Sequence, residues 1–242
     1  MAVVTGAGSG LGRAIARALL DAGHTVVLAG RTRASLHETA ADHPRAHAVV
    51  ADVTSPESVR ALFSSAREPR GRVDVLINNA GIFGGQGAVD EVEDETWHDV
   101  LAANVTGSFL CAREAVRVMK RQRPSGGRII NNGSLSAHVP RPRSVAYTVS
   151  KHAISGLTAS MNLDLRDQGI ACTQLDVGNA ATAMTAGIGV RALQPDGTSR
   201  AEAVIDPSHV ARSVVHIVSL PLEVNVPSIT VMARTMPYAG RG

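Results

Sequence analysis

Short apolar runs alternate along the whole chain with stretches in which apolar residues recur every three or four positions. The runs predict β-strands, and the longer spacing predicts amphipathic helices. Several runs are nearly continuous, which is typical of strands that are covered on both faces. The predicted strands are residues 2–5, 25–29, 46–51, 73–78, 127–131, 171–177 and 228–232.

Helical signals separate these strands. Leu11, Ile15 and Leu19 share one helical face, and Gly23 follows as a stop. Ser55 and Pro56 are typical of an N-cap and the first turn of another helix. Further helices are predicted over residues 96–121, 145–168 and 207–219.

This alternation predicts right-handed crossovers and a parallel sheet. We expect one α/β domain over residues 1–242, a doubly wound parallel sheet of about seven strands in three α/β/α layers. Residues 178–206 are long for a connection and weakly patterned, so we expect a substrate lid with Met184, Ile188 and Leu193 as apolar candidates. A plain surface insertion is the alternative.

Composition agrees with a globular enzyme-sized chain of 242 residues, 44% hydrophobic and 19% charged. No apolar run approaches the roughly 18 residues of a membrane helix, and no secretion signal is readable. Cys111 and Cys172 lie far apart, which favours reduced thiols. We therefore expect a cytoplasmic protein without a membrane partner.

The charge balance disfavours nucleic-acid binding. The net charge is +3 and the pI about 9.3, but aromatic residues make up only 2% of the chain. The arginines are scattered, whereas a nucleic-acid surface gathers basic and aromatic residues together. A local basic site for an anionic cofactor remains possible.

Four glycines fall within seven positions of VVTGAGSGLGR, residues 3–13, directly after the first predicted strand. The common Gly-x-Gly-x-x-Gly spacing is not met, and the spacing that fits is Thr5-Gly6-x-x-x-Gly10-x-Gly12. Gly10 would allow the backbone to approach phosphates at a helix N-terminus, and Gly12 would allow close helix packing. The loop predicts a Rossmann-type dinucleotide site.

The second strand ends in VVLAGRT, where an NAD site usually has an acidic residue. Here Gly30 and Arg31 stand instead. Arg31, with Arg33 nearby, is suited to clamp a 2′-phosphate through charge-assisted bonds. We expect NADP(H) as the preferred cofactor, with NAD(H) possible, and a solvated loop arginine as the alternative.

Tyr147 and Lys151 stand four residues apart and therefore share one helical face. A phenol ordinarily loses its proton near pH 10, so catalysis at neutrality needs a shift of about three units, or about 4 kcal/mol. The lysine cation and an oxidised nicotinamide would favour phenolate. Tyr147 would then be the acid in reduction and the base in oxidation. Taken alone, the pair also fits an amphipathic helix with an exposed lysine.

Together with Asn78-Asn79-Ala80-Gly81 and Ser134, these motifs resemble the short-chain dehydrogenase/reductase family, in its single-domain branch, from Ala2 to about Met184. The shared motifs are Thr5-Gly6-x-x-x-Gly10-x-Gly12, Asn78-Asn79-Ala80-Gly81, Ser134 and Tyr147-x-x-x-Lys151. Asn104, within AANVTGSF, matches the helical asparagine of the family. The resemblance implies a catalytic tetrad of Asn104, Ser134, Tyr147 and Lys151.

The resemblance also implies a role for each member. Ser134 would bond the substrate carbonyl, and Lys151 would hold the nicotinamide ribose and lower the pKa of Tyr147. Asn104 would anchor a water that relays protons. Hydride would pass between the nicotinamide and the carbonyl carbon of a ketone, or in reverse from a secondary alcohol.

Cofactor contacts carried over from the family include Thr182 on the nicotinamide carboxamide. The whole predicted set is Gly6, Ser9, Gly10, Leu11, Gly12, Arg31, Asp52, Val53, Asn79, Ala80, Gly81, Tyr147, Lys151, Val177, Gly178 and Thr182. Val177 replaces a proline common in the family, which we expect to loosen the turn. The C-terminal end also departs from the family pattern. A homodimer or homotetramer is implied by resemblance only.

The sequence contains weaker signals for two other kinds of site, a hydrolase triad and a metal site. Ser134, Asp176 and His209 occur in hydrolase order, but no Gly-x-Ser-x-Gly elbow exists. His43 and His47 belong to no cluster with ligand spacing, so no metal site is expected.

The main alternative on the same fold is a non-enzymatic NADP(H)-binding sensor, against which the presence of all four catalytic residues argues. The substrate is expected to be a small carbonyl compound or alcohol. Arg141 and Arg143 favour an anionic substrate or partner, with solvent-facing arginines as the alternative.

Overall fold

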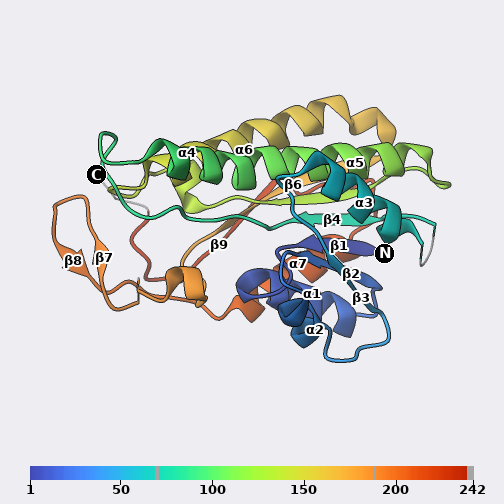
Figure 1. The fold of residues 1–242 in the computed structure, drawn as a ribbon, viewed down its shortest axis with the longest axis horizontal. Coiled ribbons are helices and arrows are strands. Elements are labelled where there is room, and N and C mark those ends of the chain that lie inside the picture. Colours follow the sequence, from blue (N-terminus) through green and yellow to red (C-terminus); the bar gives the residue numbers. More distant parts are fainter. Residues whose placement is uncertain (69–70, 188, 239–242) are drawn as a thin grey trace.

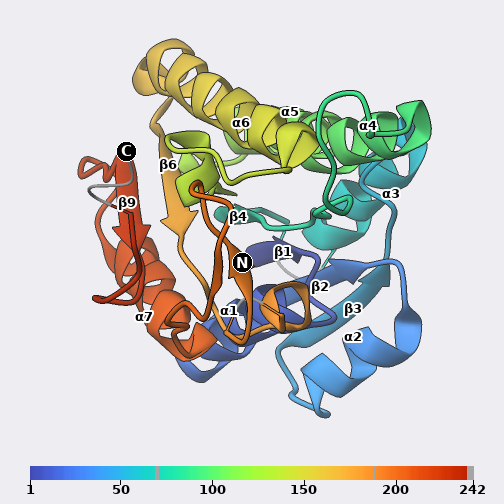
Figure 2. The ribbon, with the colours of Figure 1, turned by 90° about the vertical axis from the view of Figure 1, so that its left-hand side faces the viewer.

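Seven parallel strands form the central sheet in the order β3-β2-β1-β4-β5-β6-β9. Figure 2 looks onto one edge of this sheet, with β9 and β3 at its two ends. The computed structural model describes residues 1–68, 71–187 and 189–238. The seven predicted strands are all confirmed, and no boundary differs by more than two residues. The strands are β1 (Ala2–Thr5), β2 (Val26–Gly30), β3 (Ala46–Val50), β4 (Val75–Asn78), β5 (Gly127–Asn132), β6 (Ile170–Val177) and β9 (Ser228–Val231).

Helices cover both faces of this sheet and make the predicted three layers (Figure 1). One face carries α1 (Gly10–Asp21), α2 (Arg33–Ala40) and α7 (Pro207–Ser219), and the other carries α3 (Pro56–Arg67), α4 (Asp94–Leu101), α5 (Gly107–Arg121) and α6 (Val145–Asp164). Alternate residues of β1 enter different cores, since Val4 packs with Ile15 whereas Val3 packs with Phe63. Burial on both faces explains the continuous apolar runs.

The helix predicted over residues 96–121 is interrupted. A π-helical turn, Ala102–Thr106, separates α4 from α5. Such turns insert an extra residue and are frequent at functional sites. Here the turn buries Asn104, which is 2% exposed. The helix predicted over residues 145–168 is α6 followed by the 3-10 turn Arg166–Gln168.

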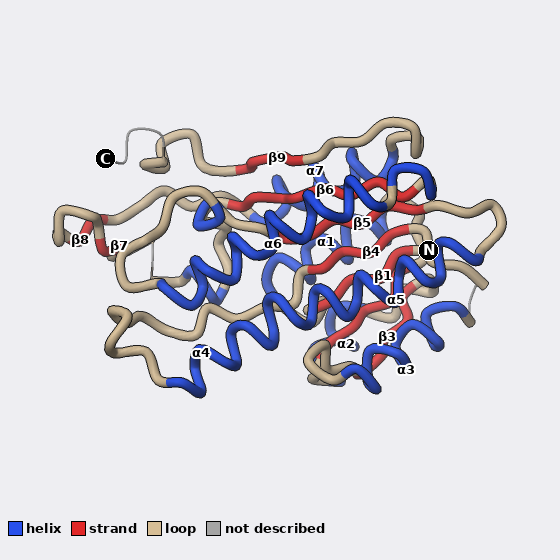
Figure 3. The backbone as a smooth tube through the Cα atoms, turned by 90° about the horizontal axis from the view of Figure 1, so that it is seen from above, coloured by secondary structure: helices blue, strands red, loops and turns tan. Residues whose placement is uncertain are grey.

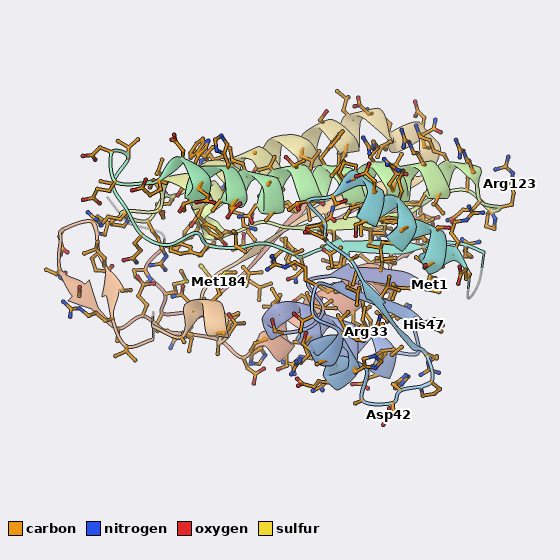
Figure 4. The ribbon with its side chains drawn as sticks, in the orientation of Figure 1. Met1, Arg33, Asp42, His47, Arg123 and Met184 are labelled. Atoms are coloured by element: carbon orange, nitrogen blue, oxygen red, sulfur yellow. The ribbon has the colours of Figure 1, made fainter. Side chains whose placement is uncertain are left out.

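The order of the sheet reverses at β1 and β4, because the chain winds outward to β3 on one side and to β9 on the other. The carboxyl ends of all seven strands share one edge, on the left in Figure 1. Met1 and Arg123 mark the opposite edge in Figure 4. In open α/β sheets the crevice at such a reversal is where ligands bind.

The weakly patterned segment 178–206 contains a 3-10 turn, Ala183–Thr185, and an antiparallel hairpin of β7 (Ala192–Leu193) and β8 (Ser199–Arg200). The hairpin projects beyond the carboxyl edge of the sheet (Figure 3). Met184 lies between the hairpin and the sheet (Figure 4). Ile188, predicted as a lid residue, is outside the described residues.

Candidate active site

A cleft of about 660 Å³ opens at the carboxyl edge of the sheet, where the loops after β1 and β4 meet. Fifteen of the sixteen predicted cofactor residues line it, and Lys151 is the exception. The lining residues from that set are Gly6, Ser9, Gly10, Leu11, Gly12, Arg31, Asp52, Val53, Asn79, Ala80, Gly81, Tyr147, Val177, Gly178 and Thr182. Met184, predicted as a lid residue, also lines the cleft. Asn132 lines it too and was missed, since its position depends on the fold around it.

The glycine loop has the shape of a cradle for phosphates. Gly6 and Gly10 adopt φ of +63° and +51°, a backbone region that favours glycine. At Ser9, the N-cap of α1, no side-chain bond caps the helix. The first N–H groups of α1 therefore remain for an anion, and the dipole of the helix favours one. These residues fit the pyrophosphate of a dinucleotide.

Threonine and asparagine side chains tie this loop to the loop after β4. Thr5 Oγ1 accepts bonds of 3.0 Å from the backbone N–H groups of Asn79 and Ala80. The Asn79 amide in turn donates to the Thr5 carbonyl at 3.0 Å. These hydrogen bonds hold the two walls of the cleft together, and the Asn79 side chain contributes to them.

Substituting Gly12 by Ala is expected to damage the cradle, because a Cβ there would collide with the carbonyl oxygen of Gly6. Such overpacking costs about 1–3 kcal/mol. We expect lower stability in urea unfolding and weaker NADPH binding. Gly156→Ala in α6 is the matched control, because a Cβ there meets nothing within 4 Å. That change should be neutral or stabilise the helix, and equal behaviour of the two variants would contradict the cradle.

Arg31 is exposed on the rim of the cleft and is close enough to Asp52 to help lower its pKa. The main causes of the low pKa of Asp52 are hydrogen bonds from the backbone and hydroxyl of Thr54, at 2.9 and 2.8 Å. Arg33 begins α2 and is not among the described lining residues. Arg31 and Arg33, which the sequence analysis groups together, therefore differ, because Arg31 lines the cleft and Arg33 does not.

Tyr147, Lys151 and Ser134 converge beside the cleft. A hydrogen bond joins Ser134 to Tyr147. Lys151 is 6% exposed, and its Nζ lies 5.4 Å from the Tyr147 ring centroid and donates to the Asn132 carbonyl at 2.7 Å. The structure therefore brings together the three residues predicted for chemistry.

Asn104 joins this group through its neighbours. Its side chain donates to the Ile82 carbonyl at 2.9 Å and accepts from the Ile82 N–H at 2.8 Å. It also donates to Ser150 Oγ of α6 at 3.0 Å. The amide thus fixes the segment after β4 against the helix that carries Tyr147.

Burial has the largest effect on the pKa values of Tyr147 and Lys151. It raises the pKa of Tyr147, with Asp176 adding to the rise, while the Ser134 hydrogen bond and Arg141 oppose it. Burial lowers the pKa of Lys151 to about 8, and Asp176 opposes that fall. The lowered phenol pKa expected from the sequence is therefore not produced by the protein alone, because desolvation outweighs the nearby cations.

A second pocket of about 250 Å³ adjoins the cleft, and Tyr147 lines both. Its walls are largely apolar: Phe83, Leu135, Pro142, Val177, Met184, Leu193 and Met236. Leu193 and Met184 come from the segment predicted as a lid, and Met236 comes from the C-terminal segment after β9. Both segments therefore shape this pocket.

The two arginines near the pocket have different surroundings. Arg141 lines the pocket and forms a buried ion pair with Glu202 at 2.6 Å. Arg143 forms an exposed ion pair with Glu91. Of the two predicted arginines only Arg141 lines the pocket, and Glu202 balances its charge. Arg191, which the sequence analysis did not single out, lines the pocket too.

Val177 is the last residue of β6 and pairs with Val231, and the N–H of the next residue, Gly178, donates to the Val231 carbonyl at 2.9 Å. Pairing with β9 therefore holds the chain at Val177, and the expected loosening of the turn stays a prediction. Thr182 lies over the glycine loop, where a Cβ at Gly10 would be 3.4 Å from its side chain. The start of the segment 178–206 thus closes one side of the cleft.

The hydrolase arrangement does not form. Asp176 Oδ1 accepts from the backbone N–H of Ser134 at 2.9 Å, but His209 is exposed on α7, where its Nδ1 bonds Arg212. His138 is the histidine that meets Asp176, at 2.8 Å. Among the described residues, no His, Cys, Asp or Glu side chains gather in threes as metal ligands would. Within the same ranges no helix is suited to cross a membrane.

Comparison with known proteins agrees with this geometry. The chain is 38% identical over 190 residues to a 3beta-hydroxysteroid dehydrogenase of Mediterraneibacter gnavus, covering 76% of this chain and 67% of that one. An alcohol dehydrogenase of the archaeon Thermococcus sibiricus, complexed with 5-hydroxy-NADP, superposes with a TM-score of 0.82 at 25% identity, covering 95% of this chain and 94% of that one. An actinorhodin polyketide ketoreductase variant with NADPH gives 0.84 at 29% identity, covering 97% and 95%.

The family model described as short chain dehydrogenase matches residues 1–191, which contain the glycine loop and the residues from Asn104 to Lys151. These two structural neighbours have a similar fold, and each contains a nicotinamide cofactor. The chain therefore belongs to the short-chain dehydrogenase family of oxidoreductases.

Proposed function

We propose that this protein is an NADP(H)-dependent oxidoreductase that moves hydride between the nicotinamide and a carbonyl compound or secondary alcohol. One observation carries the proposal. Tyr147 lies at the junction of the cleft and the apolar pocket, with Ser134 bonded to it and Lys151 behind it. A proton donor at such a junction can reach a substrate in one cavity while a dinucleotide fills the other.

The cofactor, when bound, supplies or accepts the hydride. In reduction, Ser134 and Tyr147 would both donate hydrogen bonds to the substrate oxygen in the pocket. The Tyr147 proton then passes to that oxygen as negative charge develops on it. In oxidation the phenolate takes the hydroxyl proton. Lys151, held by Asn132, presents its positive charge to the Tyr147 ring and stabilises the phenolate.

Preference for NADP(H) is supported by Arg31 at the rim of the cleft and by the absence of an acidic residue directly after Gly30. Two of the structural neighbours carry NADPH or an NADP derivative. Replacing Arg31 by Ala should weaken NADPH binding by about 1.5–3 kcal/mol, the range of a hydrogen bond to a charged group, and leave NADH binding nearly unchanged.

Titration of both cofactors by fluorescence measures this effect, with Arg33→Ala as the control because Arg33 stands two positions further on, at the start of α2, and does not line the cleft. Equal loss of NADH and NADPH affinity in the Arg31 variant would contradict a role in 2′-phosphate recognition. Tighter binding of NADH by the unaltered protein would overturn the cofactor preference itself.

Turnover is tested with a panel of ketones, aldehydes and secondary alcohols, including steroid and sugar carbonyls, by following nicotinamide absorbance. Oxidation or reduction of any of them at a rate that depends on protein concentration supports the proposal. Binding of NADPH with no turnover across the panel would contradict it.

Membership of the family supports three further parts of this proposal: a cytoplasmic location, a homo-oligomer and a lid formed by residues 178–206. Phe109 of α5 and Val149 of α6 are 47% and 40% exposed and offer apolar contacts for a second copy. Met184 and Leu193 line the pocket, as lid residues would.

A further inference from the structure

We infer that Asp176 and His138 form a positioning pair for the proposed reaction, holding Ser134 in place and setting the local charge beside Tyr147. The inference rests on the proposed function, which uses Ser134 and Tyr147 but neither of these two residues.

Asp176 stands at the carboxyl end of β6 and is 1% exposed. Its Oδ1 accepts the backbone N–H of Ser134 at 2.9 Å, and Gln174 Nε2 donates to both of its oxygens at 2.9 Å. The approach is close enough that a Cβ at Gly133 would collide with Oδ1. The carboxylate therefore fixes the backbone from which the Ser134 hydroxyl projects.

His138 completes the arrangement. It follows the 3-10 turn Leu135–Ala137 that begins at Ser134, and its Nε2 lies 2.8 Å from Asp176 Oδ2. The two oxygens of Asp176 thus hold both ends of this short turn. The His138 side chain is 44% exposed, whereas that of Asp176 is 2% exposed. His138 therefore links a buried carboxylate to the surface of the protein.

The negative charge of Asp176 acts on Tyr147 and Lys151. The ionisable groups around Asp176 are His138 from the segment after β5 and Tyr147 and Lys151 from α6, and its partner in β9 is the uncharged Thr230. Asp176 raises the pKa values of both Tyr147 and Lys151, and Arg141 opposes it at Tyr147. An acidic group here therefore keeps the phenol protonated, which favours reduction over oxidation at a given pH.

Asp176→Asn tests the charge while preserving the shape of the side chain. We expect the pH at which alcohol oxidation is half-maximal to fall by about one unit, because Asp176 raises the pKa of Tyr147 and a nearby charge shifts a pKa by about 1–3 units. An unchanged profile, with wild-type kcat, would overturn the electrostatic role. A lower kcat at every pH without a shift would also overturn it and leave Asp176 a purely structural residue.

His138→Phe and His138→Gln test the link from the histidine to the serine. Gln retains a donor that can reach Asp176, whereas Phe does not. We expect kcat to fall by up to about 100-fold in the Phe variant, through misplacement of Ser134, and to be largely restored in the Gln variant. Equal activity of the two variants would overturn the positioning role of His138.

A readout without turnover separates this inference from the proposed function. The Ser134 amide proton should resonate far downfield in the NMR spectrum of the full-length protein, because it donates to a buried carboxylate. It should move upfield in His138→Phe and keep its position in His138→Gln. If the amide follows this pattern but the panel shows no turnover, the proposed function fails and the pair stands. If the amide ignores His138, the pair fails whatever the activity.

Discussion

Replacing Tyr147 by Phe should lower kcat by about 10²–10⁴-fold, the usual contribution of a positioned general acid or base. The change removes one hydroxyl and keeps the ring, which packs against Phe83 with centroids 5.2 Å apart. The pocket therefore retains its shape. Steady-state turnover with any substrate found in the panel measures the effect, and NADPH titration should give wild-type affinity.

Tyr238→Phe is the matched control, because Tyr238 is the other tyrosine in the chain and packs against the cluster of Leu135, Ala233 and Met236. It should retain full activity. Tyr147→Phe with turnover within a few-fold of wild type would contradict the proposed proton transfer. Because burial raises the pKa of Tyr147, reduction, which needs the phenol, should persist at neutral pH, and oxidation, which needs the phenolate, should increase as pH rises.

Replacing Arg141 by Met should destabilise the protein by about 3–5 kcal/mol, the cost of removing one member of a buried ion pair. The carboxylate that loses this arginine is that of Glu202, whose side chain is 1% exposed. The amides of Asn179 and Gln194, both at 2.9 Å, would still bond it, but neither carries a charge. Urea unfolding measures the loss, and proteolysis between β7 and β8 should become faster because Glu202 anchors that hairpin.

Arg143→Met is the control, because its ion pair with Glu91 is exposed and is worth about 1 kcal/mol or less. Adding Glu202→Leu to Arg141→Met should restore part of the stability, since the buried carboxylate that lost its arginine is then removed. Arg141→Met with the stability of the control would show that the ion pair anchors nothing.

The same ion pair has a defined pH dependence. Its bonds hold the pKa of Glu202 at about 2, below the ordinary 4.5. A carboxyl with a depressed pKa stabilises the fold fully above its unfolded pKa and loses that contribution as pH falls through the folded value. The stabilisation from Glu202 should therefore be complete above about pH 4.5 and disappear towards pH 2.

The sheet was predictable because its strands are buried on both faces and each appears as an unbroken apolar run. Helix α2 escaped prediction because only Leu36 and Thr39 of its eight residues are buried, which leaves little periodic signal. The hairpin of β7 and β8 was missed because each strand has two residues and β8 is polar and exposed.

The candidate site also contains some residues that the sequence predicts and others that it does not. Residues in contiguous motifs, such as the glycine loop and Tyr147 with Lys151, were found because helix and turn geometry bring them together locally. Asp176 and His138 were not recognised as a pair, since they are 38 positions apart and meet only after β5 and β6 align. The effect of burial, which raises the pKa of Tyr147, could not be read from the sequence because burial is a property of the packed structure.

The pocket that Met184, Leu193 and Met236 help to wall off has a consequence for how such proteins diversify. The residues that we propose for proton transfer, Ser134 and Tyr147, lie after β5 and on α6, whereas these three side chains come from the segment 178–206 and the chain after β9. Under the proposed function, selectivity and reactivity would reside in separable parts of the polypeptide. Exchanging the two peripheral segments for those of a relative would then retarget the protein to another compound without rebuilding its chemistry.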